Sequence, residues 1–303
     1  MNTKNDFTVS IDHSKCIQCR LCAIECPSRT ASADHIHSDH SSPLCDKCFH
    51  CYAICPQNAI RIQGFDEEQV KDGQKISLPD FQFFLKKRRS CRKYLRKPIP
   101  EDYLDKLIES TRYCPSGGNV QDLSITVIKD PLKRELVEEE IIRYYDKIIR
   151  FLRIPLVRLF MKFFGDAKVK ETANDKDFFK KIEGIYARLK AGENCIFWDA
   201  PAVMIFHSDR LLPTACEDCI LAAYNVVLSA NALDLGSCFV SLSQQAIASS
   251  NRIKELIGIP KSDFIYSALV LGFPAVRYRR IPPRKEKQVM LGLPDVPFRT
   301  IKV

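Results

Sequence analysis

Eight of the fourteen cysteines form two runs with one spacing. The runs occupy residues 16–26 and 45–55, and each reads C-x2-C-x2-C-x3-C followed by a proline. Such a run supplies the thiolates of a 4Fe–4S cluster. A structural zinc site uses four ligands in two separated pairs, and a disulfide framework does not require this repeated spacing. Two complete runs, offset by 29 residues, therefore predict two clusters and single-electron chemistry.

A basic segment, residues 86–97, contains eight Lys or Arg among twelve residues. Within it, Arg88, Arg89, Ser90 and Arg92 follow the expected end of a helix. Guanidinium groups together with a hydroxyl suit a phosphate. The alternative is a solvated helix face, which is the commoner role of a charged run.

Residues 115–121, PSGGNVQ, have the composition of a tight turn without bulky side chains. A flat ligand can lie against such a backbone while an amide side chain binds its polar edge. The candidate residues are Pro115, Ser116, Gly117 and Asn119. By itself the segment is equally compatible with an ordinary turn.

Alternation and helical periodicity indicate the elements that position these residues. The expected strands are 7–12, 59–63, 123–129, 202–206 and 264–271. A long helix is expected at 214–234, and most of 131–195 reads as helical. Because the strands do not alternate regularly with helices and no GxGxxG follows a strand, we predict an α+β fold, with an antiparallel or mixed sheet flanked by helices, and not a doubly wound sheet.

We divide the chain into an N-terminal domain, 1–66, a polar linker, 67–79, and a second domain, 80–303. The first domain has few apolar residues, so we expect the clusters to hold it together. Its loop 28–43 contains three histidines, which we interpret as solvated and not as metal ligands.

Charge is distributed unevenly along the chain. Residues 1–70 carry a net charge of −3, and the remaining residues carry +12. This asymmetry favours docking of the two parts and attraction of phosphorylated cofactors, and we do not expect nucleic-acid binding. Residues 1–14 lack the apolar core of a signal peptide, and the free thiols fit a reducing compartment, so we expect a cytoplasmic protein, from an oxygen-poor environment.

Residues 5–65 resemble a bacterial two-cluster ferredoxin. In such proteins the fourth cysteine of each run ligates the other cluster. The resemblance therefore implies a first cluster held by Cys16, Cys19, Cys22 and Cys55. It implies a second cluster held by Cys45, Cys48, Cys51 and Cys26.

Four segments of residues 80–303 together resemble the FMN-dependent nitroreductase family. They are RRSCR at 88–92, the PSGGNVQ turn, LGSCFVSL at 235–242, and PPRK at 282–285. The resemblance implies that Arg88, Arg89, Ser90, Arg92 and Arg284 or Lys285 bind the FMN phosphate. It also implies that four residues line the flavin ring from the partner subunit, namely Pro115, Ser116, Gly117 and Asn119. Backbone N–H groups near Ser241 and Leu242 would face flavin N5, with no side chain acting as a catalytic acid or base.

The same resemblance implies a homodimer, with 274–303 as a C-terminal arm around the partner. Residues 131–195 would be a helical insertion. Its apolar stretch 141–164 carries basic residues opposite a wide apolar face. We expect it to cover the active site or to pack at the dimer interface, and membrane-surface contact is the less favoured alternative.

We therefore expect an enzyme, a flavin-dependent oxidoreductase in which two clusters relay electrons to FMN. The acceptor implied by the resemblance is a small flat molecule, such as a nitroaromatic or a quinone. Alternatives are an NAD(P)H-fed flavoprotein that exports electrons through the clusters, and a non-catalytic electron carrier or redox sensor. External ferredoxin and NAD(P)H are the two candidate donors, and some relatives perform dehalogenation instead.

Overall fold

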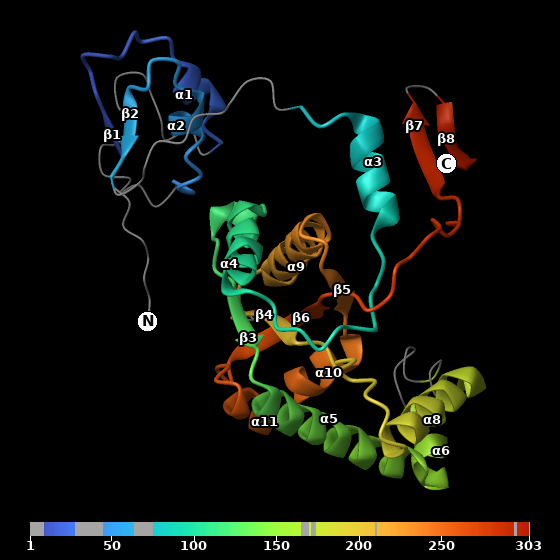
Figure 1. Cartoon of the computed structure of the whole chain (residues 1–303). Coiled ribbons are helices and arrows are strands. Elements are labelled where there is room, and N and C mark those ends of the chain that lie inside the picture. Colours follow the sequence, from blue (N-terminus) through green and yellow to red (C-terminus); the bar gives the residue numbers. More distant parts are fainter. Residues whose placement is uncertain are drawn as a thin grey trace.

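The structure is a computed structural model of the chain, and it describes residues 9–27, 45–63, 75–164, 170, 174–209, 211–293 and 296–302. The histidine-rich loop 28–43 and most of the expected linker therefore lie outside the described residues. We call residues 9–63 the N-terminal part and residues 75–293 the main body (Figure 1). No helix in the described ranges is long and apolar enough to cross a membrane.

The N-terminal part contains two short strands and two short helices in a repeated order. Its elements are β1 (Val9–Ile11), α1 (Leu21–Glu25), α2 (His50–Ile54) and β2 (Ile60–Ile62). β1 and β2 pair in antiparallel fashion, with Val9 opposite Ile62. Only Val9 and Ile60 form the fully buried centre of its apolar cluster, and Cys22, Cys51 and Cys55 pack against them. The thiols are therefore part of the small core of the N-terminal part.

A four-stranded sheet forms the centre of the main body, in the order β3-β4-β6-β5 with antiparallel pairing throughout. Its strands are β3 (Ser124–Ile128), β4 (Ala202–Asp209), β5 (Gly236–Phe239) and β6 (Asp263–Gly272). β4 is central and buried on both faces along almost its whole length. The α+β prediction is confirmed, although the sequence did not predict β5 as a strand.

Helices cover both faces of this sheet, because alternate residues of each strand point to opposite sides. On one face, Met204 and Phe206 pack with α4 (Glu101–Glu109) and α9 (Ala215–Ala232). On the other, Val203 and Ile205 pack with α5 (Pro131–Leu152), α10 (Ser241–Ser249) and α11 (Asn251–Leu256). Figure 1 shows α4 and α9 on the opposite side of the strands from α5 and α10.

The remaining elements are α3 (Leu78–Lys87), the 3-10 turns η1 (Ser110–Tyr113) and η2 (Gly117–Asn119), α6 (Pro155–Phe164) and α8 (Lys176–Lys190). Pro155 separates α5 from α6, because proline cannot donate the backbone hydrogen bond that a continuous helix requires. The expected C-terminal arm contains a hairpin, β7 (Gln288–Leu293) with β8 (Val296–Lys302), that the sequence did not predict.

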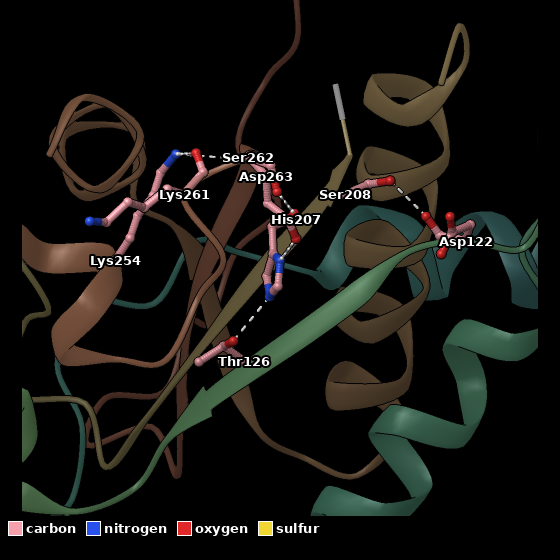
Figure 2. Close-up of polar contacts among 8 residues, drawn as sticks. All are labelled: Asp122, Thr126, His207, Ser208, Lys254, Lys261, Ser262 and Asp263. Atoms are coloured by element: carbon pink, nitrogen blue, oxygen red, sulfur yellow. Dashed lines mark hydrogen bonds and ion pairs between the residues drawn. The ribbon is translucent and has the colours of Figure 1, made fainter. Parts of the chain in front are cut away.

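A buried polar network links the strands β3, β4 and β6 (Figure 2). His207 lies between two partners: its Nδ1 is 2.8 Å from Asp263 Oδ2, and its Nε2 is 3.0 Å from Thr126 Oγ1. Lys254, also buried, donates from Nζ to the Asp263 backbone oxygen at 2.7 Å. Since His207 is 4% exposed and its ring nitrogens are engaged, it has a structural role.

We predict that Asp263→Ala lowers the stability of the main body by about 2–3 kcal/mol, because it leaves a buried imidazole nitrogen without its partner. Asp263→Asn keeps an oxygen acceptor and should cost less than half as much. The measurement is a urea unfolding curve followed by fluorescence of Trp198, the single tryptophan. Equal midpoints for the two variants would contradict this assignment.

Candidate functional site

The first candidate site is a pocket in the N-terminal part. Its lining brings Cys55 of the second run together with Cys16, Cys19 and Cys22 of the first. Cys55 thus lies with the first run and not only with its own. Burial raises the pKa of the Cys22 thiol, and the neighbouring Cys19 and Cys55 act in the same direction. These four thiols lie close together, and the ionisation of Cys22 is disfavoured unless a cation is near it. Such a group of thiols is suited to a metal-containing centre.

Cys51 of the second run is half-buried, and its neighbouring thiols come from both runs. Burial raises the pKa of the Cys51 thiol to about 11, and the thiols of Cys48, Cys22 and Cys26 add to this effect. Cys26 therefore lies close to the second run, and Cys45 is half-buried at its start. Among the described residues, no three His, Cys, Asp or Glu side chains converge on one point closely enough for a single metal ion. A multinuclear cluster does not require such convergence, because its thiolates bind different irons.

The backbone of the two cysteine runs is repeated almost identically. We call residues 16–22 the first cysteine loop and residues 45–51 the second cysteine loop. Gln18 and Arg20 have φ of 53° and 63°, and the equivalent Lys47 and Phe49 have φ of 50° and 58°. Left-handed residues within such a loop turn backbone N–H groups toward its concave side, which is an arrangement that anionic iron–sulfur centres use. Non-glycine residues in this region are strained, so the conformation is itself a functional signal.

The second candidate site begins where the segment 88–95, which we call the arginine segment, packs beside β5. Cys91 N donates to Ser237 O at 2.9 Å, and Leu95 N donates to Phe273 O at 2.8 Å. Gly236 permits this approach, because a Cβ at that position would lie 2.7 Å from Cys91 Cβ. The basic run is therefore held against the edge of the main sheet.

Three residues of the arginine segment gather around the buried thiol of Cys238. Burial raises the pKa of Cys238, while Arg92, a hydrogen bond with Ser90, and Arg88 oppose that rise. Arg88 and Arg89 are half-buried, and Arg92 is exposed. The structure thus brings Arg88, Ser90 and Arg92 into one cationic neighbourhood.

Arg92 is also a wall of the larger pocket of the main body, which has a volume of about 810 Å³. Its other walls come from 239–242, from Trp198, and from the insertion helices α5 and α8. Arg92 and Arg188 lie over the Trp198 ring, with Cζ 5.7 and 5.9 Å from its centroid. Among the described residues of the lining, these arginines are the charged ones; the others are largely apolar and include no acidic side chain. The pocket is therefore suited to a flat, anionic ligand.

The first turn of α10 opens into this pocket at Ser241 and Leu242. No side chain caps this helix, and its first turn contains no acidic residue. Its first N–H groups have no intrahelical acceptor, so they are available to a ligand oxygen or nitrogen. Tyr145 of α5 supports the turn by donating from its hydroxyl to Leu242 O at 2.8 Å.

The glycine turn, as we call residues 115–121, lies elsewhere. None of its residues lines the large pocket of the same chain. Gly117 N donates to Asp218 Oδ1 of α9 at 3.2 Å, and Asn119 Nδ2 donates to Lys47 O at 2.7 Å. Within one chain, the structure therefore separates the predicted ring-lining residues from the predicted phosphate-binding ones.

Two other residues that the sequence predicts to bind the phosphate, Arg284 and Lys285, form no hydrogen bond or ion pair with the arginine segment among the described residues. Arg284 and Lys285 are exposed, and within the described ranges neither forms a hydrogen bond or an ion pair. The segment that precedes them does approach, since Tyr278 Oη donates to Ser90 O at 3.3 Å. The sequence also missed Tyr145, Arg188 and Trp198, because their positions depend on the packing of the insertion and carry no local motif.

Comparison with known proteins agrees with this geometry. Residues 85–273 match the Nitroreductase family, and residues 8–56 match a 4Fe-4S dicluster domain. A protein of Methanothermobacter thermautotrophicus, provisionally named NADH dehydrogenase/NAD(P)H nitroreductase, is 24% identical over 66% of this chain and 81% of its own length. An iodotyrosine deiodinase of Nematostella vectensis is 22% identical over 72% of this chain and 76% of its own.

Among solved structures, a BluB-like flavoprotein of Clostridium difficile 630 superposes with a TM-score of 0.50 at 20% identity. The match covers 68% of this chain and 94% of that chain. A likeness at this level of identity establishes a common fold.

We predict that Tyr145→Phe loosens the first turn of α10, because Leu242 O loses a hydrogen bond worth about 1 kcal/mol. Hydrogen exchange of the amides at 244–246 should accelerate by about fivefold. Tyr144→Phe is the matched control, since the Tyr144 hydroxyl forms no hydrogen bond with any described residue. The same acceleration in both variants would mean that the Tyr145 hydroxyl does not support this turn.

Proposed function

Because the chain belongs to the nitroreductase family and carries a 4Fe-4S dicluster domain, we propose that it is an FMN-dependent oxidoreductase in which two 4Fe–4S clusters relay electrons to the flavin. The proposed acceptor is a small flat molecule such as a nitroaromatic or a quinone. The observation that carries the proposal is the large pocket, where Arg92, Trp198 and the open first turn of α10 meet.

The lining of this pocket supports FMN as its ligand. Its volume of about 810 Å³ exceeds the size needed for a ring alone, so an acceptor can share the space. Arg88, Ser90 and Arg92 form a phosphate-binding neighbourhood beside Cys238, and the C. difficile relative is itself described as a flavoprotein. N–H groups at Ser241 and Leu242 would donate toward the polar edge of the ring, where negative charge develops on reduction.

The cysteine arrangement supports two clusters. One set would be Cys16, Cys19, Cys22 and Cys55, as grouped in the cysteine pocket. The other would be Cys45, Cys48, Cys51 and Cys26, and two of these, Cys48 and Cys26, act on the perturbed Cys51 thiol. When bound, the clusters supply one-electron transfer and FMN couples it to two-electron chemistry. The residues of the chain bind, orient and exclude water, with protons drawn from solvent.

A homodimer would complete the flavin site. The glycine turn lies away from the large pocket of its own chain, and this separation supports its contribution to the pocket of a partner subunit.

The helical insertion would act as a lid over the flavin in this proposal. Ile148 and Ile149 of α5 and Ile185 of α8 line the pocket, so they would contact the acceptor over the flavin.

Reductive dehalogenation of an aromatic substrate is a second candidate reaction. The observation that favours it is the match to an iodotyrosine deiodinase over 72% of this chain, a range that includes the insertion helices. Nitroaromatic, quinone and halogenated aromatic acceptors are all flat and apolar, so the pocket accommodates each class. Oxidation of the reduced protein by one representative of each class distinguishes these acceptors, and oxidation by none would favour a carrier or sensor.

We expect the anaerobically purified protein to contain about eight irons and one FMN per chain. Replacing both Arg88 and Arg92 with alanine should weaken FMN binding by at least about a hundredfold, because charge-assisted hydrogen bonds to the phosphate are lost. Iron content should not change. Arg96→Ala, in the same basic run but outside the pocket lining, is the control. Unchanged FMN affinity in the double variant would place the phosphate elsewhere, and absence of flavin from the wild type would refute the function.

The electron donor is tested by an anaerobic visible spectrum during titration with NADH, NADPH and reduced two-cluster ferredoxin. We expect ferredoxin to bleach the flavin band through the clusters. Rapid bleaching by a nicotinamide alone would instead favour a flavin that is reduced by hydride and that exports electrons through the clusters.

A Cys22→Ala variant should lose one cluster, and its flavin should be reduced more slowly by ferredoxin. An unchanged rate of flavin reduction would exclude the clusters from the electron path.

A further inference from the structure

The two cysteine loops have matching backbones but different surroundings. Cys19 in the first cysteine loop is exposed, whereas the equivalent Cys48 in the second is half-buried. Gln18 is likewise exposed, and the equivalent Lys47 is half-buried. Because the loops repeat each other's dihedral angles, the difference in exposure arises from what packs around each loop.

The glycine turn of the main body contacts the second loop. Asn119 Nδ2 donates to the Lys47 backbone oxygen at 2.7 Å, across 72 residues of sequence. Gln121 Nε2 orients this amide by donating to Asn119 Oδ1 at 2.8 Å. Figure 1 shows the N-terminal part on the side of the main body where α4 and α9 lie, and the glycine turn is anchored to α9.

The glycine turn is a rigid platform for this contact. Gly117 N donates to Asp218 of α9, which is 8% exposed, and a Cβ on Gly117 would overlap the Thr214 side chain. Gly118 and Asn119 both have positive φ, of 55° and 52°. A strained turn persists only when its surroundings hold it. The position of Asn119, and with it that of the second loop, is therefore fixed relative to α9.

We infer that the second cysteine loop is the electron outlet of the N-terminal part and that the first cysteine loop is its inlet. The inference rests on the proposed function, in which the glycine turn lines the flavin. When bound, the cluster held by Cys45, Cys48, Cys51 and Cys26 would lose one electron in each transfer, and the flavin would gain it. Two transfers, with two protons from solvent, account for the two-electron reduction. Electron tunnelling weakens steeply with distance, so the loop that contacts the glycine turn has the shorter path.

The first cysteine loop has the surface of an inlet for an external protein donor. Three apolar side chains beside its pocket are exposed to solvent: Ile17 by 61%, Leu21 by 37% and Ile24 by 77%. Small, weak and partly apolar interfaces are typical of electron-transfer partners. The partner that fits is a small one-electron iron–sulfur protein that docks over this rim and donates one electron at each encounter.

Hydrogen exchange on the anaerobic holoprotein tests the outlet. Asn119→Ala should accelerate amide exchange in 45–51 by at least about fivefold and leave 16–22 unchanged, since one docking hydrogen bond is lost. The control is Asn231→Ala, where the same side chain donates to a backbone oxygen, that of Phe84, within the main body. This control should leave both loops unchanged. Unchanged exchange in 45–51, or equal acceleration in the two loops, overturns the outlet.

A footprint tests the inlet. Added reduced two-cluster ferredoxin should slow exchange in 16–22 of the wild-type protein and not in 45–51. Protection of 45–51, or of neither loop, overturns the inlet. Flavin content, measured on the same sample, separates the two levels of failure. Protein that lacks flavin but shows the predicted exchange pattern would refute the proposed function, and would leave only the contact between the glycine turn and the second cysteine loop. Flavin-loaded protein without that pattern would refute only the assignment of the loops.

Discussion

The close packing of the arginine segment against two glycines is the constraint on which the rest of the main body depends. A side chain at Gly236 would collide with Cys91, and one at Gly272 would collide with Pro201 and Tyr94. Without those side chains, the arginine segment extends the sheet beyond β5 through a parallel bridge from Ser90 to Ser237. The cationic residues that follow α3 are thereby fixed at the mouth of a largely apolar pocket.

The pocket formed beside this edge combines the end of a sheet strand with the helices between β3 and β4. Its floor comes from the strand end at Phe239 and the start of α10, and all of its lining residues lie within the region that matches the family. Its wall comes from α5 and α8, whose apolar residues also pack into the core against Ile205 and Val270. The insertion is therefore part of the core and part of the pocket wall, and its pocket-facing residues, such as Ile148 and Ile185, are the ones that contact a ligand.

The N-terminal part uses a different source of stability. Among the described residues of this part, Val9, Ala59 and Ile60 are the fully buried apolar ones, so the thiol groups and whatever they bind must complete the core. Strained left-handed residues at equivalent positions of both loops imply that ligand binding compensates for an unfavourable backbone. The connection to the main body by Asn119 and Lys47 then couples the position of one loop to the anchored glycine turn. The group that the thiols bind thus completes the N-terminal part, and the glycine turn of the main body positions its second cysteine loop.

The sequence by itself determined the chemistry and the fold class. Local patterns carry this information: the spacing of the cysteines, the basic run and the short apolar segments read as strands. Each pattern lies within a few neighbouring residues, so it can be recognised without the fold. The sequence did not predict β5, because Gly-Ser-Cys-Phe is too short and too weakly patterned to read as a strand without β6 beside it. Nor did it place Tyr145, Arg188 and Trp198 around one pocket, or Asn119 on the second cysteine loop. These contacts join residues far apart in the chain, so only tertiary packing, with its close approaches at glycine, decided them.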